Sequence, residues 1–209
     1  DQLKKTDQKI ESVIHLMSNQ KILIFVSSGR VFSLDPNILP SGKSNPKSIF
    51  YFIDAITNDK LVGIIKAETN KFCILVSERG KGFVSEISSM LTNQKKGKQI
   101  FNLKSSDVLV KVLECNKNHL AAVNKSGKLL IIDIKNLPIL QKGGGVQIIK
   151  IKEGDALSDI KLIDLSEGLS WKTGSKVRNI TDIKFWIGKR AQSGKKVPKF
   201  FNKNLKFFD

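Results

Sequence analysis

Lysine and arginine recur at one position of a repeated pattern in this chain, beside a glycine that separates two apolar runs. The pattern is clearest in ILIFVSSGRVFSL, FCILVSERGKGFV and LAAVNKSGKLLII, which centre on Gly29, Gly80 and Gly127. These glycines are 51 residues apart (29 to 80) and then 47 residues apart (80 to 127), and a weaker fourth copy, LSWKTGSKVRNI, centres on Gly174. β-Branched and aromatic residues around a short glycine-containing turn predict a β-hairpin. The cations expected on the hairpin turns are Arg30, Arg79, Lys81 and Lys128.

A second basic segment follows each hairpin. It is a polar, glycine-containing loop that leads into another apolar run, as in LPSGKSNPKSIFYF, NQKKGKQIFNL, LQKGGGVQIIKI and AQSGKKVPKFF. We take Gly42, Gly97, Gly144 and Gly194 as the anchors of the four copies. The cations assigned to these loops are Lys43, Lys95, Lys96, Lys98, Lys142, Lys189, Arg190, Lys195 and Lys196. In the third copy, the backbone N–H groups of Gly143, Gly144 and Gly145 are candidates to bind a phosphate.

The whole chain has an excess of positive charge, with 36 Lys and Arg against 19 Asp and Glu and a formal net charge of +17. A charge of about 2–8 is enough to keep a small domain soluble. The excess therefore favours a polyanionic partner, nucleic acid first and an anionic membrane second. Lys and Arg that neutralise DNA phosphates release counterions, which supplies affinity without sequence preference. No segment suited to reading base edges is evident, and no apolar run approaches the length of a membrane-spanning helix.

Residues 172–209 form the most basic segment, with eleven Lys and Arg against two Asp. Aromatic residues alternate with these cations, namely Phe185, Trp186, Phe200, Phe201, Phe207 and Phe208. Aromatic rings among cations can stack on unpaired bases. Because most of these rings fall in strand-like runs, we favour the alternative that they pack in the core of the last repeat.

Candidate catalytic residues are isolated from one another. The sole tyrosine, Tyr51, lies in the aromatic run IFYFID and is interpreted as a strand residue. Residues 42–44 (GKS) match the end of a phosphate-binding loop, but Asn37 stands where that motif needs its first glycine. His15 and His119 are far apart in the sequence, so neither a catalytic triad nor a metal site is indicated. We therefore expect no catalytic activity, metal or cofactor in this part of the chain.

The two cysteines and two loop aspartates have structural interpretations. Cys73 and Cys115 lie in apolar runs without a Cys-x-x-Cys spacing, which favours buried free thiols in a reducing compartment. A disulfide between them is the alternative. Asp54 and Asp59 lie in turn-like sequence and are expected to cap turns.

The elements that must position the cations form a repeat of about fifty residues. Each unit consists of a short strand that is often preceded by Asp, the hairpin, the basic loop and a further strand. Four units are expected at 7–56, 57–105, 106–155 and 156–201, followed by a tail at 202–209, within a single domain of 1–209. Only 85–94 has a helical pattern, of one or two turns. Repeats of this length with four strands each predict an all-β, propeller-like ring of blades. A sandwich of seven or eight strands is the alternative.

The same segments resemble a known family. SSGRVFSLDPNILP, SERGKGFVSEISSMLTNQKKGKQIFNL, GLSW and WIGKRAQSGKKVPKFF, in this order and spacing, are similar to the C-terminal domain of the A subunit of bacterial topoisomerase IV. The resemblance implies a β-pinwheel, in which neighbouring blades exchange a strand. From the four units counted in this sequence, we expect about four full blades plus part of another. It also implies a basic outer rim that binds and bends duplex DNA for strand passage. The catalytic domains, their ATP and magnesium, and the contact with the B subunit of topoisomerase IV would lie outside this sequence.

The A subunit of gyrase has the same fold and a wrapping loop of the form Gln-Arg-Arg-Gly-Gly-Lys-Gly. Residues 141–146 (QKGGGV) and 94–98 (QKKGK) match it only in part. These departures favour topoisomerase IV and argue against full chiral wrapping of DNA. The sequence QLKKTDQKIESVIHLM resembles the end of a preceding blade, so part of the first blade is expected before Asp1. A propeller-like protein-interaction module is the third hypothesis. We expect a monomer in the bacterial cytoplasm, associated with the nucleoid and with no membrane contact.

Overall fold

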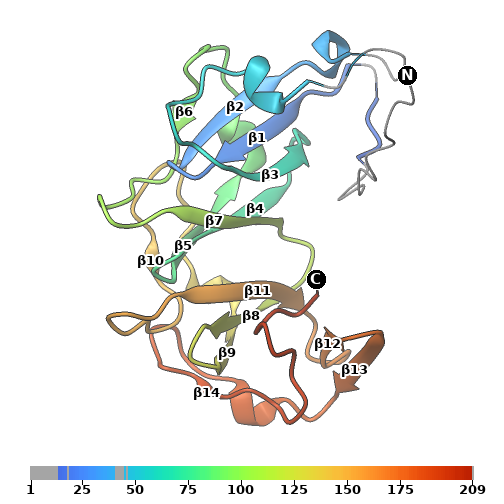
Figure 1. Ribbon diagram of the computed structural model, residues 1–209, viewed down its shortest axis with the longest axis vertical. Helices are drawn as coiled ribbons and strands as arrows, with labels where there is room; N and C mark the ends of the chain where they lie inside the picture. Colours follow the sequence, from blue (N-terminus) through green and yellow to red (C-terminus); the bar gives the residue numbers. More distant parts are fainter. Residues whose placement is uncertain (1–13, 18, 41–44, 46, 209) are drawn as a thin grey trace, which may run out of the picture.

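The protein is a stack of small antiparallel sheets (Figure 1). The computed structural model describes residues 14–17, 19–40, 45 and 47–208. Within these residues, the strands are joined by turns and by single 3-10 turns, and α-helix is absent. Three sheets have four strands each and the fourth has two. The prediction of an all-β pinwheel is therefore confirmed, with three complete four-stranded blades in the described part of the chain rather than four.

The three large sheets have the same strand order. The first contains β1 (Ile22–Val26), β2 (Arg30–Leu34), β3 (Leu61–Lys66) and β6 (Lys98–Gln99), in the order β3-β1-β2-β6. The second contains β4 (Phe72–Ser77), β5 (Lys81–Glu86), β7 (Leu109–Glu114) and β10 (Val146–Gln147), in the order β7-β4-β5-β10. The third contains β8 (His119–Asn124), β9 (Lys128–Asp133), β11 (Leu157–Ile163) and β14 (Lys195–Lys196), in the order β11-β8-β9-β14. The fourth pairs β12 (Leu169–Thr173) with β13 (Lys176–Ile180).

Each large sheet takes its two central strands from one repeat and its two outer strands from the next. In the first sheet, β3 pairs with β1 and the short strand β6 pairs with β2, although both follow the hairpin by many residues. A hairpin alone would leave two edges with unpaired backbone groups, and the next repeat fills both. The ranges 57–105 and 106–155 therefore delimit repeats of the sequence, not sheets.

The hairpin turns close as the sequence predicts. Gly29, Gly80, Gly127 and Gly174 all have positive φ, between 60° and 80°, in the region that glycine occupies without steric cost. Asp59 caps the first turn, because its carboxylate accepts the backbone N–H of Ser28 at 2.9 Å. The expectation that Asp59 caps a turn is confirmed.

The core lies between successive sheets. All five residues of β1 are buried, and the central strands of the other large sheets are buried along most of their length. Between the first two sheets, the rings of Phe83 and Phe101 meet edge to face at a centroid distance of 5.0 Å. Burying a large apolar side chain contributes about 1.5–3 kcal/mol. Since each large sheet packs one face against the next sheet, each depends on its neighbour for stability.

Several local predictions are settled by the structure. The expected helical turn at 85–94 is the 3-10 turn η3 (Ile87–Met90). Tyr51 is not in a strand, so that prediction is wrong. It ends the 3-10 turn η2 (Ile49–Tyr51), which begins where the Ser48 hydroxyl accepts the Phe50 N–H, and its side chain is 70% exposed. The remaining 3-10 turns are η1 (Pro36–Ile38), η4 (Ile134–Asn136) and η5 (Lys184–Trp186).

The cysteines are free, as predicted. Cys73 is buried and Cys115 is half-buried. Burial raises the pKa of the Cys73 thiol well above its usual range and raises the pKa of Cys115 to about 11. Both thiols are therefore protonated and unreactive near neutral pH.

Candidate nucleic-acid interface

Each hairpin turn and the basic loop of the next repeat border the same outer edge of a sheet, and we call this surface the turn rim. It comprises the hairpin turns 27–30, 78–81 and 125–128 and the loops 94–98, 141–146 and 189–196. The strand register places them along this edge, because the first residue of each second hairpin strand lies opposite the last residue of a basic-loop strand. Since the two strands are antiparallel, the basic loop runs from there alongside the second hairpin strand, and Thr92 just before the first such loop donates its N–H to the Ser33 hydroxyl. These pairs are Arg30 with Gln99, Lys81 with Gln147, and Lys128 with Lys196. The turn rim therefore repeats from sheet to sheet, as the sequence pattern requires.

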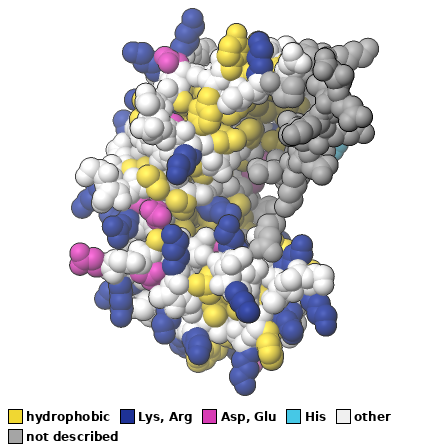
Figure 2. Space-filling view, viewed as in Figure 1, with side chains coloured by type: hydrophobic (Ala, Val, Ile, Leu, Met, Phe, Trp, Pro, Cys, Tyr) yellow, Lys and Arg dark blue, Asp and Glu magenta, His cyan; other side chains and the backbone are white. Residues whose placement is uncertain are grey.

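Most of the predicted cations of the turn rim point to solvent. The exposed ones are Arg79, Lys95, Lys96, Lys128, Lys142, Lys189, Arg190, Lys195 and Lys196. Figure 2 shows Lys and Arg side chains along the left side and lower end of the molecule, with far fewer Asp and Glu. On the left of Figure 1 lie the edge strands β6, β10 and β14. Gly42 and Lys43 lie outside the described residues.

Three of the predicted cations are half-buried, and two of them hold the loop that carries their neighbours. The Arg30 guanidinium donates to the Lys96 carbonyl at 2.8 Å, and the Lys98 ammonium donates to the Ser89 carbonyl at 2.6 Å. Lys81 is the third. Arg30 and Lys98 therefore position the exposed pair Lys95 and Lys96.

The glycines of the third basic loop have a structural role that differs from the expected phosphate contact. The anchor is Gly145 rather than Gly144: it has φ of 64°, and a Cβ there would lie 2.8 Å from the Gly82 carbonyl oxygen. Gly97 and Gly194 have the same role in their loops, because a Cβ added at either would lie only 2.7 Å from a carbonyl oxygen of the neighbouring hairpin. The Gly143 N–H donates to the Ile100 carbonyl, so it is not available to a phosphate. Gly144 is exposed.

Two glutamines that the sequence reasoning missed connect successive repeats at the turn rim. The side-chain amide of Gln99 donates to the carbonyls of Ser28 and Phe101, at 2.9 Å and 2.7 Å. Gln147 does the same with Arg79 and Ile149, at 2.7 Å each. The signal was present in the sequence, because a Gln stands two residues after Gly97 and again after Gly145.

Two further lysines reach the turn rim because of the strand exchange. Lys150 and Lys152 join Lys125 and Lys128 around a cleft of about 690 Å³. Glu153 and Asp155 also line this cleft. Lys150 and Lys152 stand beside no hairpin glycine, so only the pairing of distant strands places them there.

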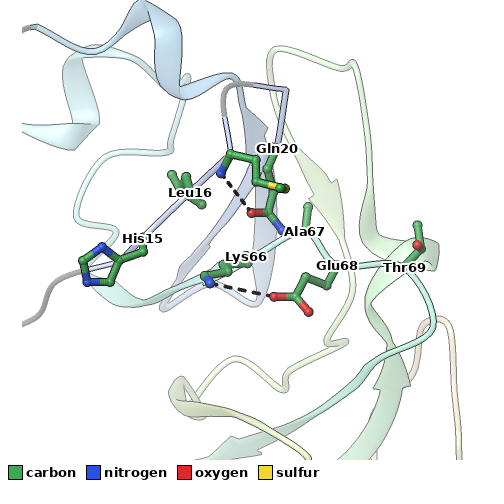
Figure 3. Close-up of a pocket in the computed structure, with 8 residues that line it drawn as sticks. His15, Leu16, Gln20, Lys66, Ala67, Glu68 and Thr69 are labelled. Atoms are coloured by element: carbon green, nitrogen blue, oxygen red, sulfur yellow. Dashed lines mark hydrogen bonds and ion pairs between the residues drawn. The ribbon is translucent and has the colours of Figure 1, made fainter.

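At the ends of the sheets away from the hairpin turns, several cations are paired with carboxylates. Lys71 lies 2.5 Å from Glu68, and Lys117 pairs with Asp164 and Glu167. The Lys71 ammonium holds the pKa of Glu68 below its ordinary value. A cleft of about 600 Å³ opens at this end beside β3, where Lys66 points toward Glu68 at 3.9 Å (Figure 3). With its cation compensated in this way, this cleft is a poorer polyanion site than the turn rim.

The aromatic residues of the C-terminal segment divide into two groups. Phe201 and Phe207 are buried beside Trp171, and Trp186 packs partly against the same core. Core packing is therefore confirmed for these rings. It is wrong for Phe185, Phe200 and Phe208, which are 57%, 69% and 43% exposed. The expected tail at 202–209 is a packed segment up to Phe207, since the Lys172 N–H donates to the Phe207 carbonyl at 2.7 Å.

The fold and the repeated basic rim define a β-pinwheel of the gyrase A C-terminal type. Residues 71–116 and 118–164 match the model of the family described as "DNA gyrase C-terminal domain, beta-propeller". Solved structures of the E. coli ParC C-terminal domain and of a gyrase A C-terminal domain align with TM-scores of 0.77 and 0.65. They are 21% and 15% identical and cover 88% and 90% of this chain, and the chain covers 79% and 64% of them. These likenesses establish the fold.

Sequence relatives narrow the family. The chain is 34% identical over 195 residues to the A subunit of DNA topoisomerase 4 from Rickettsia bellii, and the match covers 93% of this chain and 26% of the relative. The subunit of the same name from Caulobacter vibrioides is 31% identical over 204 residues, or 97% of this chain and 27% of the relative. The chain belongs to the family of C-terminal domains of the topoisomerase IV A subunit. It spans about a quarter of the length of these curated relatives. Across the described residues, no helix has the length and apolar character to cross a membrane.

Proposed function

We propose that this domain binds duplex DNA along the turn rim, without sequence preference, and bends it. The observation that carries the proposal is the recurrence of cations at the same register position of three successive sheets, Arg30, Lys81 and Lys128. Exposed lysines of the adjoining loops extend this series. Duplex DNA presents a phosphate charge about every 1.7 Å along its axis, so a row of cations neutralises several phosphates at once. Smooth bending of a short site costs about 1–6 kcal/mol, which phosphate contacts along a curved rim would offset.

A titration of labelled duplexes of increasing length, repeated at several salt concentrations, tests this function. Affinity should rise with duplex length, and the logarithm of the binding constant should fall linearly with the logarithm of salt, by about 0.9 per phosphate contacted. Duplexes of different sequence should bind alike. Fluorescence transfer between dyes at the duplex ends should rise on binding, as bending shortens their separation. If no binding occurs at low salt, the rival hypothesis of a protein-interaction module replaces this one.

We further propose that, in a longer protein, the domain positions DNA for strand passage by topoisomerase IV. The curated relatives, A subunits of topoisomerase 4 of which the chain spans about a quarter, support this. In this proposal the domain itself is not catalytic. Cleavage, ATP, magnesium and the contact with the B subunit belong to other parts of the enzyme, in the bacterial cytoplasm.

A gyrase-like wrapping domain is the alternative, favoured by the match of two repeats to the gyrase family. Ligation of a nicked plasmid in the presence of the domain separates the two. A wrapping domain would leave constrained writhe in the closed circle. We expect little or none, because the loop at 141–146 lacks two of the three cations of the wrapping motif, and the loop at 94–98 has only one of its three glycines.

A further inference from the structure

Two exposed aromatic rings lie beside the turn rim at the C-terminal end of the molecule. Phe185 is 57% exposed and Phe200 is 69% exposed. A cation covers part of each ring, with the Lys195 ammonium 4.2 Å from the centroid of Phe185 and the Arg178 guanidinium 4.8 Å from that of Phe200. Rings this exposed under a single cation still present a face to solvent.

The backbone of Phe200 is held so that its ring points outward. Its carbonyl accepts hydrogen bonds from the Trp171 indole at 3.0 Å and from the Thr173 hydroxyl at 2.9 Å. The next residue, Phe201, is buried in the core. Phe200 itself has φ of 61°, a left-handed conformation that is rare for a bulky side chain. Such strain persists where the surroundings enforce it, often at ligand sites.

Cationic clefts adjoin both rings. One cleft of about 740 Å³ is lined by Phe200 together with Lys125, Lys196, Lys199 and Lys203, and its lining contains no carboxylate. A second, also of about 740 Å³, is lined by Phe185 and Trp186 and shares residues 196–199 with the first. Its single carboxylate is Asp182. Rings beside lysines, with almost no opposing charge, suit a planar group attached to a phosphate.

We propose that these clefts bind unstacked nucleobases, with Phe200 and Phe185 as stacking platforms and Lys196 and Lys199 at the adjoining phosphates. This goes beyond the proposed function, because duplex binding along the turn rim requires no aromatic residue. Base stacking on an aromatic ring tolerates any base, since every base has a π-face. The unstacked base has two sources, a single strand or a kinked step of a duplex.

The experiment compares two labelled oligonucleotides of equal length, an oligothymidylate and an abasic strand with the same phosphates. The wild-type domain should bind the oligothymidylate at least about fivefold more tightly, since a stacked base contributes on this scale. Phe200→Ala and Phe185→Ala should each remove much of that preference, whereas Phe200→Trp should retain it. Tyr51→Ala is the matched control, because Tyr51 is 70% exposed and lies under Lys47 at 4.3 Å, but in η2. Thermal unfolding of each variant, monitored by circular dichroism, checks the fold.

Equal affinity for the two strands would overturn the proposal, as would a Phe200→Leu variant that keeps the preference. A duplex carrying 2-aminopurine distinguishes the sources, because its fluorescence rises when a base step opens. Charge reversal at Lys95 and Lys96 should weaken duplex binding and leave the preference for bases unchanged. If the wild-type domain failed to bind a duplex but kept its preference for bases, the result would count against the turn rim and not against the stacking site.

Discussion

Asp159 is buried in β11, where its carboxylate joins three parts of the molecule. One oxygen lies 3.1 Å from the Lys111 ammonium of β7, and the other accepts the Phe207 N–H at 3.0 Å. The Asp159 carboxylate therefore connects the third sheet to the second sheet and to the C-terminal segment. Lys111 is half-exposed, so solvent weakens the ion pair, but the hydrogen bond to Phe207 is buried.

Asp159→Ala should lower the free energy of unfolding by about 2 kcal/mol, because the Phe207 N–H loses a charged acceptor in the core. Urea unfolding measures the change. Glu78→Ala is the control, since Glu78 forms only an exposed pair with Lys125 at 3.8 Å and should change stability by less than about 1 kcal/mol. Equal effects of the two substitutions would contradict a buried role for Asp159.

Adjacent glycines in the third basic loop provide a second test at this scale. Gly145→Ala should cost about 1–3 kcal/mol, because alanine would occupy a left-handed conformation with its Cβ 2.8 Å from the Gly82 carbonyl oxygen. Gly144→Ala should cost little, as its Cβ would lie 3.5 Å from the nearest atom, the Asn102 carbonyl oxygen. Thermal unfolding of both variants measures the difference. A larger loss for Gly144→Ala would restore Gly144 as the anchor.

At the scale of elements, the hairpins were predictable and their partners were not. The hairpins around Gly29, Gly80 and Gly127 follow from local alternation and turn chemistry, which a short window of sequence contains. The outer strands β6, β10 and β14 have two residues each, too few for a periodic pattern. Their pairing with a hairpin of the preceding repeat is a long-range choice, so the repeats could be recognised and the sheets could not.

In the candidate site, too, the residues in a local pattern were predictable and those placed by distant strand pairing were not. The exposed lysines of the turn rim were found because they stand beside glycines. Lys150 and Lys152 were missed because strand exchange brings them to the turn rim. Tyr51 was assigned to a strand because an aromatic run resembles one, whereas the Ser48 hydroxyl starts a 3-10 turn there.

The glutamine contacts between repeats are testable at this scale. Gln99→Ala should destabilise the domain by about 1–3 kcal/mol, since two backbone carbonyls at the junction lose their donor. Hydrogen exchange should increase first in β2 and β6, which the amide of Gln99 holds together. Gln141→Ala is the matched control, because Gln141 is an exposed residue of a basic loop. Uniform exchange across all sheets would argue that Gln99 stabilises the whole domain rather than one junction.

At the scale of the whole molecule, the question is whether DNA affinity depends on the position of the cations or only on their number. A net charge of +17 attracts any polyanion. The structure separates the two explanations, because cations at the turn rim repeat in register whereas those at the opposite ends of the sheets are partly paired with carboxylates.

Lys95→Glu with Lys96→Glu should reduce duplex affinity strongly and lower the salt slope by about 2, since each phosphate contact contributes about 0.9. Both lysines are exposed, so the fold should persist. Lys98 is left unchanged because its ammonium holds the Ser89 carbonyl, and its reversal would mix stability with binding.

The control for this pair is Lys71→Glu with Lys135→Glu, which alters the net charge equally away from the turn rim, just before β4 and within η4. Lys71 and Lys135 are exposed, and the surface pair of Lys71 with Glu68 contributes little to stability. The control should lose affinity only through the weaker long-range field, an effect that salt screens over about 10 Å at 0.1 M. At that ionic strength the two double variants should therefore differ clearly in duplex binding. If they lose affinity equally, net charge and not the turn rim governs the interaction with DNA.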